Sequence, residues 1–314
     1  MTINNNAIFQ PTVDAINEHW KRSGSAESKR HYLGGSMVGS HCDRKLWYDF
    51  RHMTEENFDG RLYRLFNRGH REEFTFVDEL RAAGVEVHEV APNGKQFGFK
   101  AIGGHVAGHM DGAGKGLLEN PEAWHVLEFK THSSKSFKEL QKQAANALEA
   151  KAERIVTSQD PPERPYDSRD FYLCKWCSAQ DLCWGSEDTT APAIPVPNLS
   201  CRQCLHATPE MDGDARWSCA KKKTDRSFEE QAAPCDDMLM IPALVEWAKP
   251  IDALVDDEGH DAIIFEDEDG NTWMHGQNRD CNQYSAHDLT TMPQCLIGCT
   301  GMPAGNGYLD KNSS

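Results

Sequence analysis

The amino-acid sequence predicts an α+β fold, because helical and strand-like patterns occur in separate blocks along the chain. A long pattern at 61–83 repeats its apolar side chains at helical spacing. A second helical pattern, rich in Lys, Glu, Gln and Ala, covers 136–156. Between them, short apolar segments are separated by Gly, Pro and Asn, which is typical of strands. These predicted strands, which we expect to form an antiparallel meander, are 85–90, 96–102, 105–111 and 124–131.

Two further helices are expected before this block. Residues 1–30 form a polar, helix-prone segment in which Val13, Ile16 and Trp20 recur at helical spacing, so we expect these three side chains to dock on the core. After a glycine-rich loop, a second helix is expected to begin at Cys42 and to carry aromatic side chains on one face.

The C-terminal part of the chain differs in composition. Residues 186–200 contain three prolines together with Ser, Thr and Ala, and they read as a linker. In the region that follows, strand-like segments at 262–265 and 272–274 flank an Asp-Gly pair and predict a hairpin. The chain is therefore expected to divide into a domain at 1–185, this linker, and a cysteine-rich region at 201–314.

The composition limits the classes of function. The hydrophobic content of 39% argues against wholesale disorder, and 314 residues are enough for two domains. The formal net charge of −16 excludes a uniformly basic surface, but it leaves room for a local basic groove or for phosphate contact through a metal ion. Since no signal peptide opens the chain and no long apolar run occurs, we expect a soluble, cytoplasmic protein without a membrane span.

Three charged residues lie in the third and fourth predicted strands. Asp111 lies at the end of one strand, and Glu128 and Lys130 lie two residues apart in the next, which would place both on one face. The glycine-rich interval 112–116 reads as a connection between the strands. The carboxylates can hold a hard divalent cation, and the ammonium can steady a water or a phosphate. The alternative is two amphipathic strands whose charges face solvent.

The cysteines indicate metal binding. An odd count of 11 without secretory features fits a reducing compartment, where cysteines are more often metal ligands than disulfides. Cys174, Cys177 and Cys183 place three thiolates in a short window, and Cys42 is the only cysteine upstream that can be a fourth ligand. Four such thiolates can bind an iron–sulfur cluster or a tetrahedral zinc ion. The alternative is free or buried thiols.

A second set of four cysteines lies in the C-terminal region. Its members are Cys201, Cys204, Cys219 and Cys235. The spacing favours a structural zinc ion over free thiols, with a second iron–sulfur cluster as the minor option. His206 can replace one cysteine as a ligand. The basic run at 221–223, together with Arg226, is either a nucleic-acid contact or a solvated face. No role is assigned to Cys281, Cys295 and Cys299.

The first cysteine set and the acidic set together resemble the RecB-like, iron–sulfur branch of the PD-(D/E)XK nuclease superfamily, as found in phage recombination exonucleases and CRISPR-adaptation nucleases. In that branch one cysteine precedes the nuclease core and three follow it, around a four-iron, four-sulfur cluster. Cys42 in His-Cys-Asp-Arg-Lys-Leu-Trp-Tyr matches the first cysteine. The terminal three are matched by Cys174, Cys177 and Cys183. The resemblance covers about residues 31–185.

The same resemblance assigns the acidic site. Asp111 in Gly-His-Met-Asp-Gly matches the first metal-binding acid, and Glu128 and Lys130 match the family's E-x-K. Family members have an early helix with an acid four positions after a glycine, and Glu73 matches this acid. His70 would be an extra metal ligand of the kind that some members use. For both Glu73 and His70 the alternative is a solvated helix face. For His70 this alternative is the favoured one. The alternative for Lys130 is a surface pair with Glu128.

The implied activity is that of a DNA exonuclease in phage or bacterial recombination or repair. Asp111, Glu128 and Glu73 would bind Mg²⁺ or Mn²⁺, and the metal would offset charge on the scissile phosphate. Lys130 would position the attacking water and help to deprotonate it. Besides DNA, a recombinase or a single-strand-binding protein is an implied partner. The location would be the host cell cytoplasm if a phage encodes the chain.

One departure from the family pattern leaves a second function open. The family follows its lysine with a helix bearing Gln-x-x-x-Tyr, whereas Gln141 and Gln143 are followed four positions later by Ala145 and Ala147. The PD-(D/E)XK core therefore reads as shortened. The alternative is a catalytically impaired metal-binding module that binds DNA ends or a protein partner. A third hypothesis is a zinc-stabilised interaction protein with no nucleic-acid role.

Overall fold

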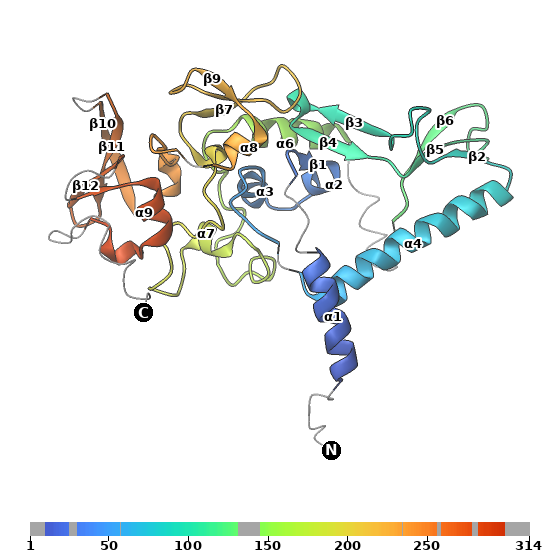
Figure 1. The fold of residues 1–314 in the computed structure, drawn as a ribbon, viewed down its shortest axis with the longest axis horizontal. Helices are drawn as coiled ribbons and strands as arrows, with labels where there is room; N and C mark the ends of the chain where they lie inside the picture. The colour runs from blue at the N-terminus through green and yellow to red at the C-terminus, as the bar shows by residue number, and fades with distance from the viewer. Residues whose placement is uncertain are drawn as a thin grey trace. The chain divides into compact units, whose positions relative to one another are not determined.

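The computed structural model describes residues 10–24, 30–56, 58–130, 145–233, 235–255, 259–277 and 282–298. This part of the chain combines α-helices with four small β-sheets of three or four strands, which is compatible with the predicted α+β class. The chain divides into two compact units, both drawn in Figure 1. Unit 1 comprises Met1–Lys29, Glu56–Phe99 and Gly108–Ala144. Unit 2 comprises Arg30–Glu55, Lys100–Ala107 and Ala145–Ser314.

Unit 1 contains a long helix and a three-stranded sheet. Helix α4 (Gly60–Ala82) confirms the predicted helix, and its first turn is capped by the Asp59 side chain, which accepts a hydrogen bond from Leu62 N at 2.8 Å. The sheet runs along α4 (Figure 1). Its antiparallel strands, in the order β2-β5-β6, are β2 (Glu86–His88), β5 (Gly112–Lys115) and β6 (Trp124–Leu127). The small core between helix and sheet consists of Val77, Val85, Val87 and Leu127.

Helix α1 (Pro11–Gly24) also belongs to unit 1, but it buries none of its side chains. Val13 and Ile16 are 39% and 40% exposed. The expectation that they dock on the core is therefore wrong. The partly buried Trp20 lies in a groove against α4 and not in a core. This happens because an amphipathic pattern specifies an apolar face and leaves open what covers it.

Unit 2 is built on two helices, α3 (Asp43–Phe50) and α6 (Ala145–Thr157), which contact each other. Helix α3 begins at Cys42 as predicted, and the Cys42 Sγ accepts a hydrogen bond from Lys45 N at 3.4 Å. Leu46, Trp47, Tyr48 and Phe50 are all at most 1% exposed and form the centre of the core. Smaller elements of unit 2 are α2 (Gly35–Val38), α7 (Gln180–Trp184), β1 (Leu33–Gly34) and η1 (Ile102–Gly104). Strands β3 (Gly98–Ala101) and β4 (Val106–His109) each have residues in both units.

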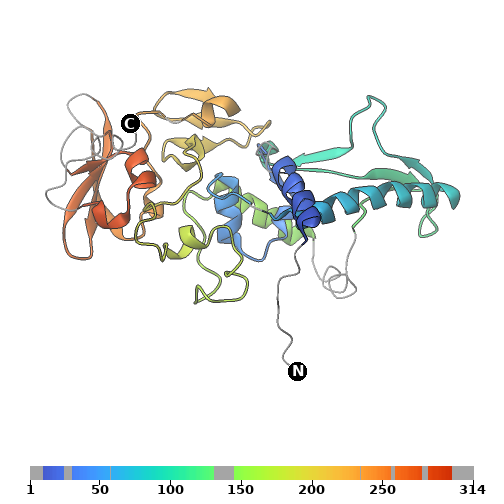
Figure 2. The same cartoon turned by 60° about the horizontal axis from the view of Figure 1, so that its bottom comes forward.

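Two further sheets lie in the C-terminal part of unit 2. The antiparallel sheet β7 (Ala207–Pro209), β8 (Trp217–Cys219) and β9 (Thr224–Arg226) is flanked by η2 (Cys201–Gln203) and α8 (Phe228–Gln231). The other sheet has the order β10-β11-β12-β13, and helix α9 lies beside it (Figure 2). Its elements are η3 (Pro242–Leu244), β10 (Ala248–Val255), β11 (Asp261–Asp267), β12 (Thr272–His275), β13 (Gln283–Tyr284), α9 (Ala286–Thr291) and η4 (Gln294–Leu296). The β11–β12 pair confirms the predicted hairpin.

The strands near the acidic residues differ from the prediction. The interval 112–116, expected to be a connection, contains β5. Glycine reads as a turn residue, but here it allows a close approach, since a Cβ on Gly114 would stand 3.2 Å from the Leu127 side chain. In addition, β6 ends at Leu127, so Glu128 and Lys130 lie just after the strand and not within it.

The compact units also cut across the expected linear division. The middle of the expected linker at 186–200 packs into the core, where Ile194 is 2% exposed and its N–H donates to Leu289 O at 2.9 Å. The domain boundaries at 185 and 201 stay a prediction, because a unit of dense contacts and a segment that folds alone need not coincide. The first part of the helix predicted at 136–156 falls on residues outside the described ranges, and α6 begins at Ala145.

Two buried arginines connect the segments of unit 2. Arg51 and Arg202 are 2% and 1% exposed. The Arg51 guanidinium donates to Arg202 O at 2.7 Å and to Ser158 O at 2.8 Å. Arg202 donates to Phe50 O at 3.1 Å, to His31 O at 3.0 Å and to Gln231 Oε1 at 3.0 Å. The guanidinium groups also lie over the rings of Trp47 and Trp217. Burial lowers the pKa of Arg51 to about 10 and that of Arg202 to about 9.

Substituting Arg202 should therefore destabilise unit 2. We expect Arg202→Met to lower the free energy of unfolding by about 2–4 kcal/mol, because it leaves buried carbonyls without their donors. Urea unfolding followed by circular dichroism measures this loss. Lys95, which is exposed, provides the control, since Lys95→Met should change stability by less than about 0.5 kcal/mol. Equal stability of the two variants would show that the Arg202 guanidinium contributes nothing to the free energy of unfolding.

A buried histidine joins the last sheet to the rest of unit 2. The His275 side chain is fully buried, its Nε2 accepts a hydrogen bond from Met240 N at 2.7 Å, and its Nδ1 lies 2.9 Å from Tyr284 O. The first contact requires an unprotonated Nε2, so Nδ1 carries the proton and donates it to the carbonyl. Burial lowers the pKa of His275 to about 4, although the contact with Tyr284 O acts in the opposite direction.

The stability of the protein should consequently fall on mild acidification. Between pH 6.5 and about 4 the unfolded state binds a proton at His275 that the folded state does not, so the stabilisation is complete above pH 6.5 and decreases as the pH falls. The expected loss is about 3 kcal/mol. Unfolding curves at several pH values should show a smaller pH dependence for His275→Gln than for His287→Gln, a control at an exposed histidine. Identical pH profiles would contradict this assignment.

Candidate functional site

Asp111 is held in place by the chain that follows β6. It lies between β4 and β5, and its backbone N–H donates to Leu127 O at 3.0 Å. Its carboxylate Oδ2 accepts a hydrogen bond from Phe129 N at 2.6 Å. The Phe129 ring in turn stacks on Phe76 of α4, with the ring centroids 5.5 Å apart. The Asp111 carboxylate therefore has a defined position at the edge of the sheet of unit 1.

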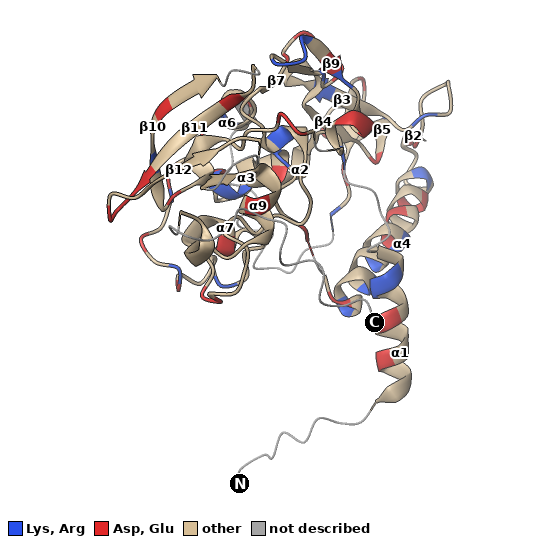
Figure 3. Cartoon of the chain, turned by 60° about the vertical axis from the view of Figure 1, so that its left-hand side comes forward, with Lys and Arg blue, Asp and Glu red and all other residues tan. Residues whose placement is uncertain are grey.

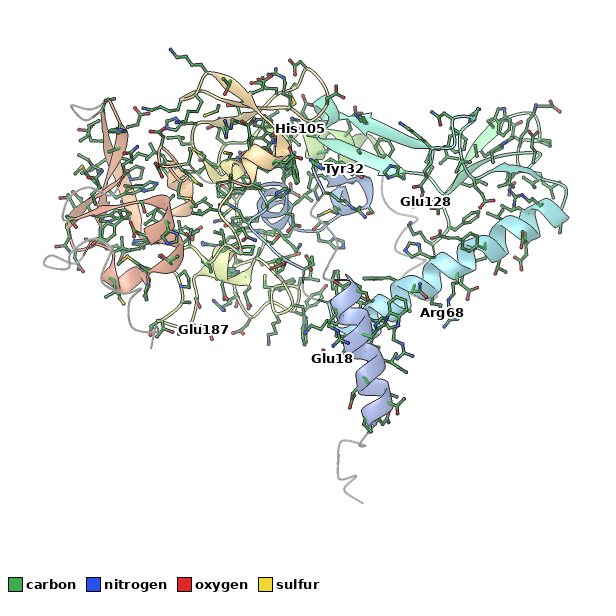
Figure 4. All side chains as sticks on the ribbon, in the orientation of Figure 1. Glu18, Tyr32, Arg68, His105, Glu128 and Glu187 are labelled. Atoms are coloured by element: carbon green, nitrogen blue, oxygen red, sulfur yellow. The ribbon has the colours of Figure 1, made fainter. Side chains whose placement is uncertain are left out.

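Glu128 and Lys130 lie on either side of Phe129 and contact each other. The Lys130 Nζ is 2.5 Å from Glu128 Oε1. The side chain of Glu128 is 45% exposed and that of Lys130 is 54% exposed. Figure 4 places Glu128 on the side of the sheet that faces α4. The two side chains thus share one side of the chain, as the sequence predicted, although the backbone there is not a strand.

The electrostatics connect these residues to α4. Burial acts to lower the pKa of Lys130, but the hydrogen bond to Glu128 and the charges of Glu128, Asp111 and Glu73 outweigh it and raise that pKa above its usual value. The Glu73 carboxylate also lies 3.3 Å from His70 Nδ1. The His70 side chain is 73% exposed, as expected for a solvated helix face. Three carboxylates therefore act on a single ammonium.

The carboxylates are engaged with protein donors in this arrangement. Among the residues that the structure describes, no group of three or more His, Cys, Asp or Glu side chains has the arrangement of a metal site. Asp111 is bonded to Phe129 N and Glu128 to Lys130, so a cation would have to draw Glu128 away from the ammonium. The donor set itself fits Mg²⁺ or Mn²⁺, which prefer carboxylate oxygens.

A groove between α1 and α4 concentrates positive charge in unit 1. Its volume is about 610 Å³. The residues that line it include Ile16, Trp20, Leu65, Arg61, Arg64, Arg68 and Arg71. The arginines are three or four residues apart and so share one face of the helix. Arginines lie along α4 together with Asp and Glu (Figure 3). The sequence analysis missed this groove, although the arginine spacing was a signal for it.

The first cysteine set meets at a small cavity in unit 2. Cys42, Cys174, Cys177 and Cys183 line a cavity of about 20 Å³. Lys45 and Arg164 line the same cavity, and sequence reasoning did not find either of them. Burial raises the pKa of Cys177 and of Cys183, and nearby N–H groups and cations oppose this shift. The volume accommodates about one water-sized atom, so the walls would have to move to admit a four-iron cluster.

The second cysteine set meets in the same way. Cys201, Cys204, Cys219 and Cys235 line another cavity of about 20 Å³ in unit 2, and His206 also lines it. Burial raises the pKa of Cys204 to about 12. Cys295 is exposed. Gln141, Gln143, Cys281 and Cys299 lie outside the described residues.

Comparisons with known proteins add nothing to this geometry. No described helix is long and apolar enough to cross a bilayer. A scan against models of protein families, a search of curated proteins and a search of solved structures each found no match.

Proposed function

We propose that the chain is a metal-dependent DNA exonuclease that uses Asp111, Glu128, Lys130 and Glu73. The observation that carries the proposal is the position of the Lys130 ammonium, whose pKa is raised by all three carboxylates. A surface ion pair joins two side chains and contributes little. Here four side chains come from three segments, namely α4, the β4–β5 junction and the chain after β6. A PD-(D/E)XK type of core accounts for this combination.

The chemistry follows from the donors. A bound Mg²⁺ or Mn²⁺ would offset charge on the scissile phosphate and lower the pKa of a bound water. The Asp111 carboxylate is already oriented by the hydrogen bond from Phe129 N. The raised pKa keeps Lys130 protonated at neutral pH, so its ammonium donates hydrogen bonds. Lys130 therefore orients the attacking water and stabilises negative charge on the phosphate, which differs from the expected role in deprotonation.

The arginine-lined groove supports DNA as the substrate. Four guanidinium groups on one face of α4 provide a local attraction for phosphates despite the net charge of −16. Arginine suits this task because its planar fork can donate two hydrogen bonds to one phosphate. The side chain of Trp20 in the same groove could stack on a base of single-stranded DNA.

A non-catalytic function is the second candidate. The net charge of −16 and the lack of tyrosine four positions after Gln141 or Gln143 favour it. The chain would then bind DNA ends or a protein partner without cutting. Salt-sensitive binding to DNA ends, with no loss of DNA in Mn²⁺, is the result that distinguishes this function from the nuclease.

Substitutions at the site should abolish DNA degradation. We expect Asp111→Asn and Lys130→Met each to lower the rate by at least about 100-fold, because each removes a group that contacts the metal or the reacting phosphate. The measurement is the loss of end-labelled DNA in Mn²⁺, with EDTA as the blank. Lys95→Met, at an exposed lysine of the same unit, should keep the full rate.

The outcome separates the two candidate functions. Equal rates for Lys130→Met and Lys95→Met would show that the proposed site is wrong. No degradation by a wild-type protein that binds DNA ends would replace the nuclease with the binding module. Circular dichroism of each variant controls for loss of fold, since the side chains of Lys130 and Lys95 both reach solvent.

We further propose that Cys42, Cys174, Cys177 and Cys183 hold a metal centre that joins the start of α3 to the segment around α7. The common cavity and the cations that line it support this proposal. The resemblance to the nuclease family implies a four-iron, four-sulfur cluster, whereas the cavity volume favours a single ion such as zinc. Either centre would be structural, since four protein thiolates leave no open coordination position.

Cys42→Ser should remove this centre. Anaerobically purified wild-type protein should be brown and contain about four irons per chain if a cluster is present, or be colourless with zinc if a single ion is present. Cys42→Ser should lose the iron, or one zinc per chain, whereas Cys295→Ser at an exposed cysteine should not. Unchanged metal content in Cys42→Ser would exclude Cys42 as a ligand.

A further inference from the structure

The C-terminal cysteines reach one cavity from three separate segments. Cys201 and Cys204 lie at the start and the end of η2. Cys219 ends β8, and its pairing with Ala207 of β7 brings it next to the first pair. Cys235 follows α8. All four side chains line the cavity of about 20 Å³, which has room for about one water-sized atom.

Backbone groups contact two of the sulfur atoms. Lys222 N donates to Cys219 Sγ at 3.4 Å, which closes the tight turn between β8 and β9. The Cys201 thiol donates to Glu230 O at 3.8 Å. The N–H of Lys222 would stabilise a thiolate at Cys219 once a metal ion has displaced the protons of the thiols.

Positive side chains line the same cavity. Lys221, Lys222 and Arg226 are among its lining residues. A divalent ion with four thiolates carries a net charge of about −2, which would be costly at a partly buried site without cations nearby. Each of the three cations is also paired with a carboxylate, Lys221 with Asp261, Lys222 with Asp237 and Arg226 with Glu230. Asp237 lines the cavity as well, so the cations offset only part of that cost.

We propose that Cys201, Cys204, Cys219 and Cys235 bind one structural zinc ion with tetrahedral thiolate coordination. Zinc fits because the cavity admits one ion and four protein ligands leave no open position, as is usual for structural sites. In the described part of the structure these four sulfur atoms are not arranged as in a metal site. Binding of the ion would therefore draw them together, to Zn–S distances of about 2.3 Å. His206 lies beside the cavity and is not needed as a ligand.

The position of the site gives the ion a function in folding. Arg202 lies within η2, between Cys201 and Cys204, and its guanidinium is the buried donor to His31 O and Phe50 O. A metal that fixes η2 therefore also fixes Arg202 in the core of unit 2. The binding free energy of the ion becomes folding free energy. This inference does not depend on the proposed nuclease activity.

The test compares metal content and cysteine reactivity in the full-length protein. Cys219→Ser should contain one zinc per chain less than wild type and should melt at a lower temperature, whereas Cys295→Ser should match wild type in both. Wild-type zinc content in Cys219→Ser would exclude the site. Because zinc is counted as a difference between variants, metal at the first cysteine set does not affect the result.

A second measurement covers the case in which Cys219→Ser fails to fold. In native wild-type protein, alkylation by iodoacetamide, read by peptide mass spectrometry, should be at least about tenfold slower at Cys219 and Cys235 than at Cys295, and a chelator should remove the protection. Cys219 is only partly buried, so burial alone does not account for such protection. Protection that persists in the metal-free, folded protein, or alkylation as fast as at Cys295, would overturn the proposal.

Discussion

The contact between Arg51 and Arg202 is the interaction on which unit 2 depends. Two cations are buried, and the hydrogen-bond acceptors described for them are backbone carbonyls and one side-chain amide, supplied by segments that are far apart in sequence. Burial without a carboxylate costs free energy, which the carbonyl dipoles and the faces of Trp47 and Trp217 offset. Each acceptor would be left unsatisfied if its segment moved, so the segments are held together. Since Arg202 lies inside η2, the same contact connects the core to the second cysteine cavity.

Unit 1 depends on a smaller set of contacts. Among the described residues of unit 1, four buried side chains form the core, so the stacking of Phe129 on Phe76 is important for attaching the end of β6 to α4. The hydrogen bond from Phe129 N then fixes the orientation of the Asp111 carboxylate. Lys130 and Glu128 flank the same phenylalanine. The proposed catalytic residues are therefore positioned by one aromatic contact and one backbone hydrogen bond, which explains how so small a unit can present them together.

Local features of the structure were predictable. The helix that begins at Cys42, the long α4 and the β11–β12 hairpin each depend on neighbours within a few residues, through a capping sulfur, an apolar repeat and an Asp-Gly turn. Strand β5 was missed because its glycines resemble a turn until Leu127 is known to pack against them. Ile194 was missed because the prolines around it hid its place in the core and its backbone hydrogen bond to Leu289 O of α9. In each case a tertiary contact outweighed the local signal.

The sequence by itself determined which chemical groups are available: two sets of four thiols, and an aspartate, a glutamate and a lysine near two strands. It also determined the local conformations that begin at Cys42 and surround Glu73. The family resemblance also implied that Cys42 joins Cys174 and that Glu73 joins Lys130. Only the tertiary structure decided how these groups meet, at a cavity and through the charge of Glu73, and that the α4 arginines line a groove with Trp20. The physical reason is that spacing along the chain determines contacts only between residues that are close in sequence. Contacts between distant residues depend on how the whole core packs.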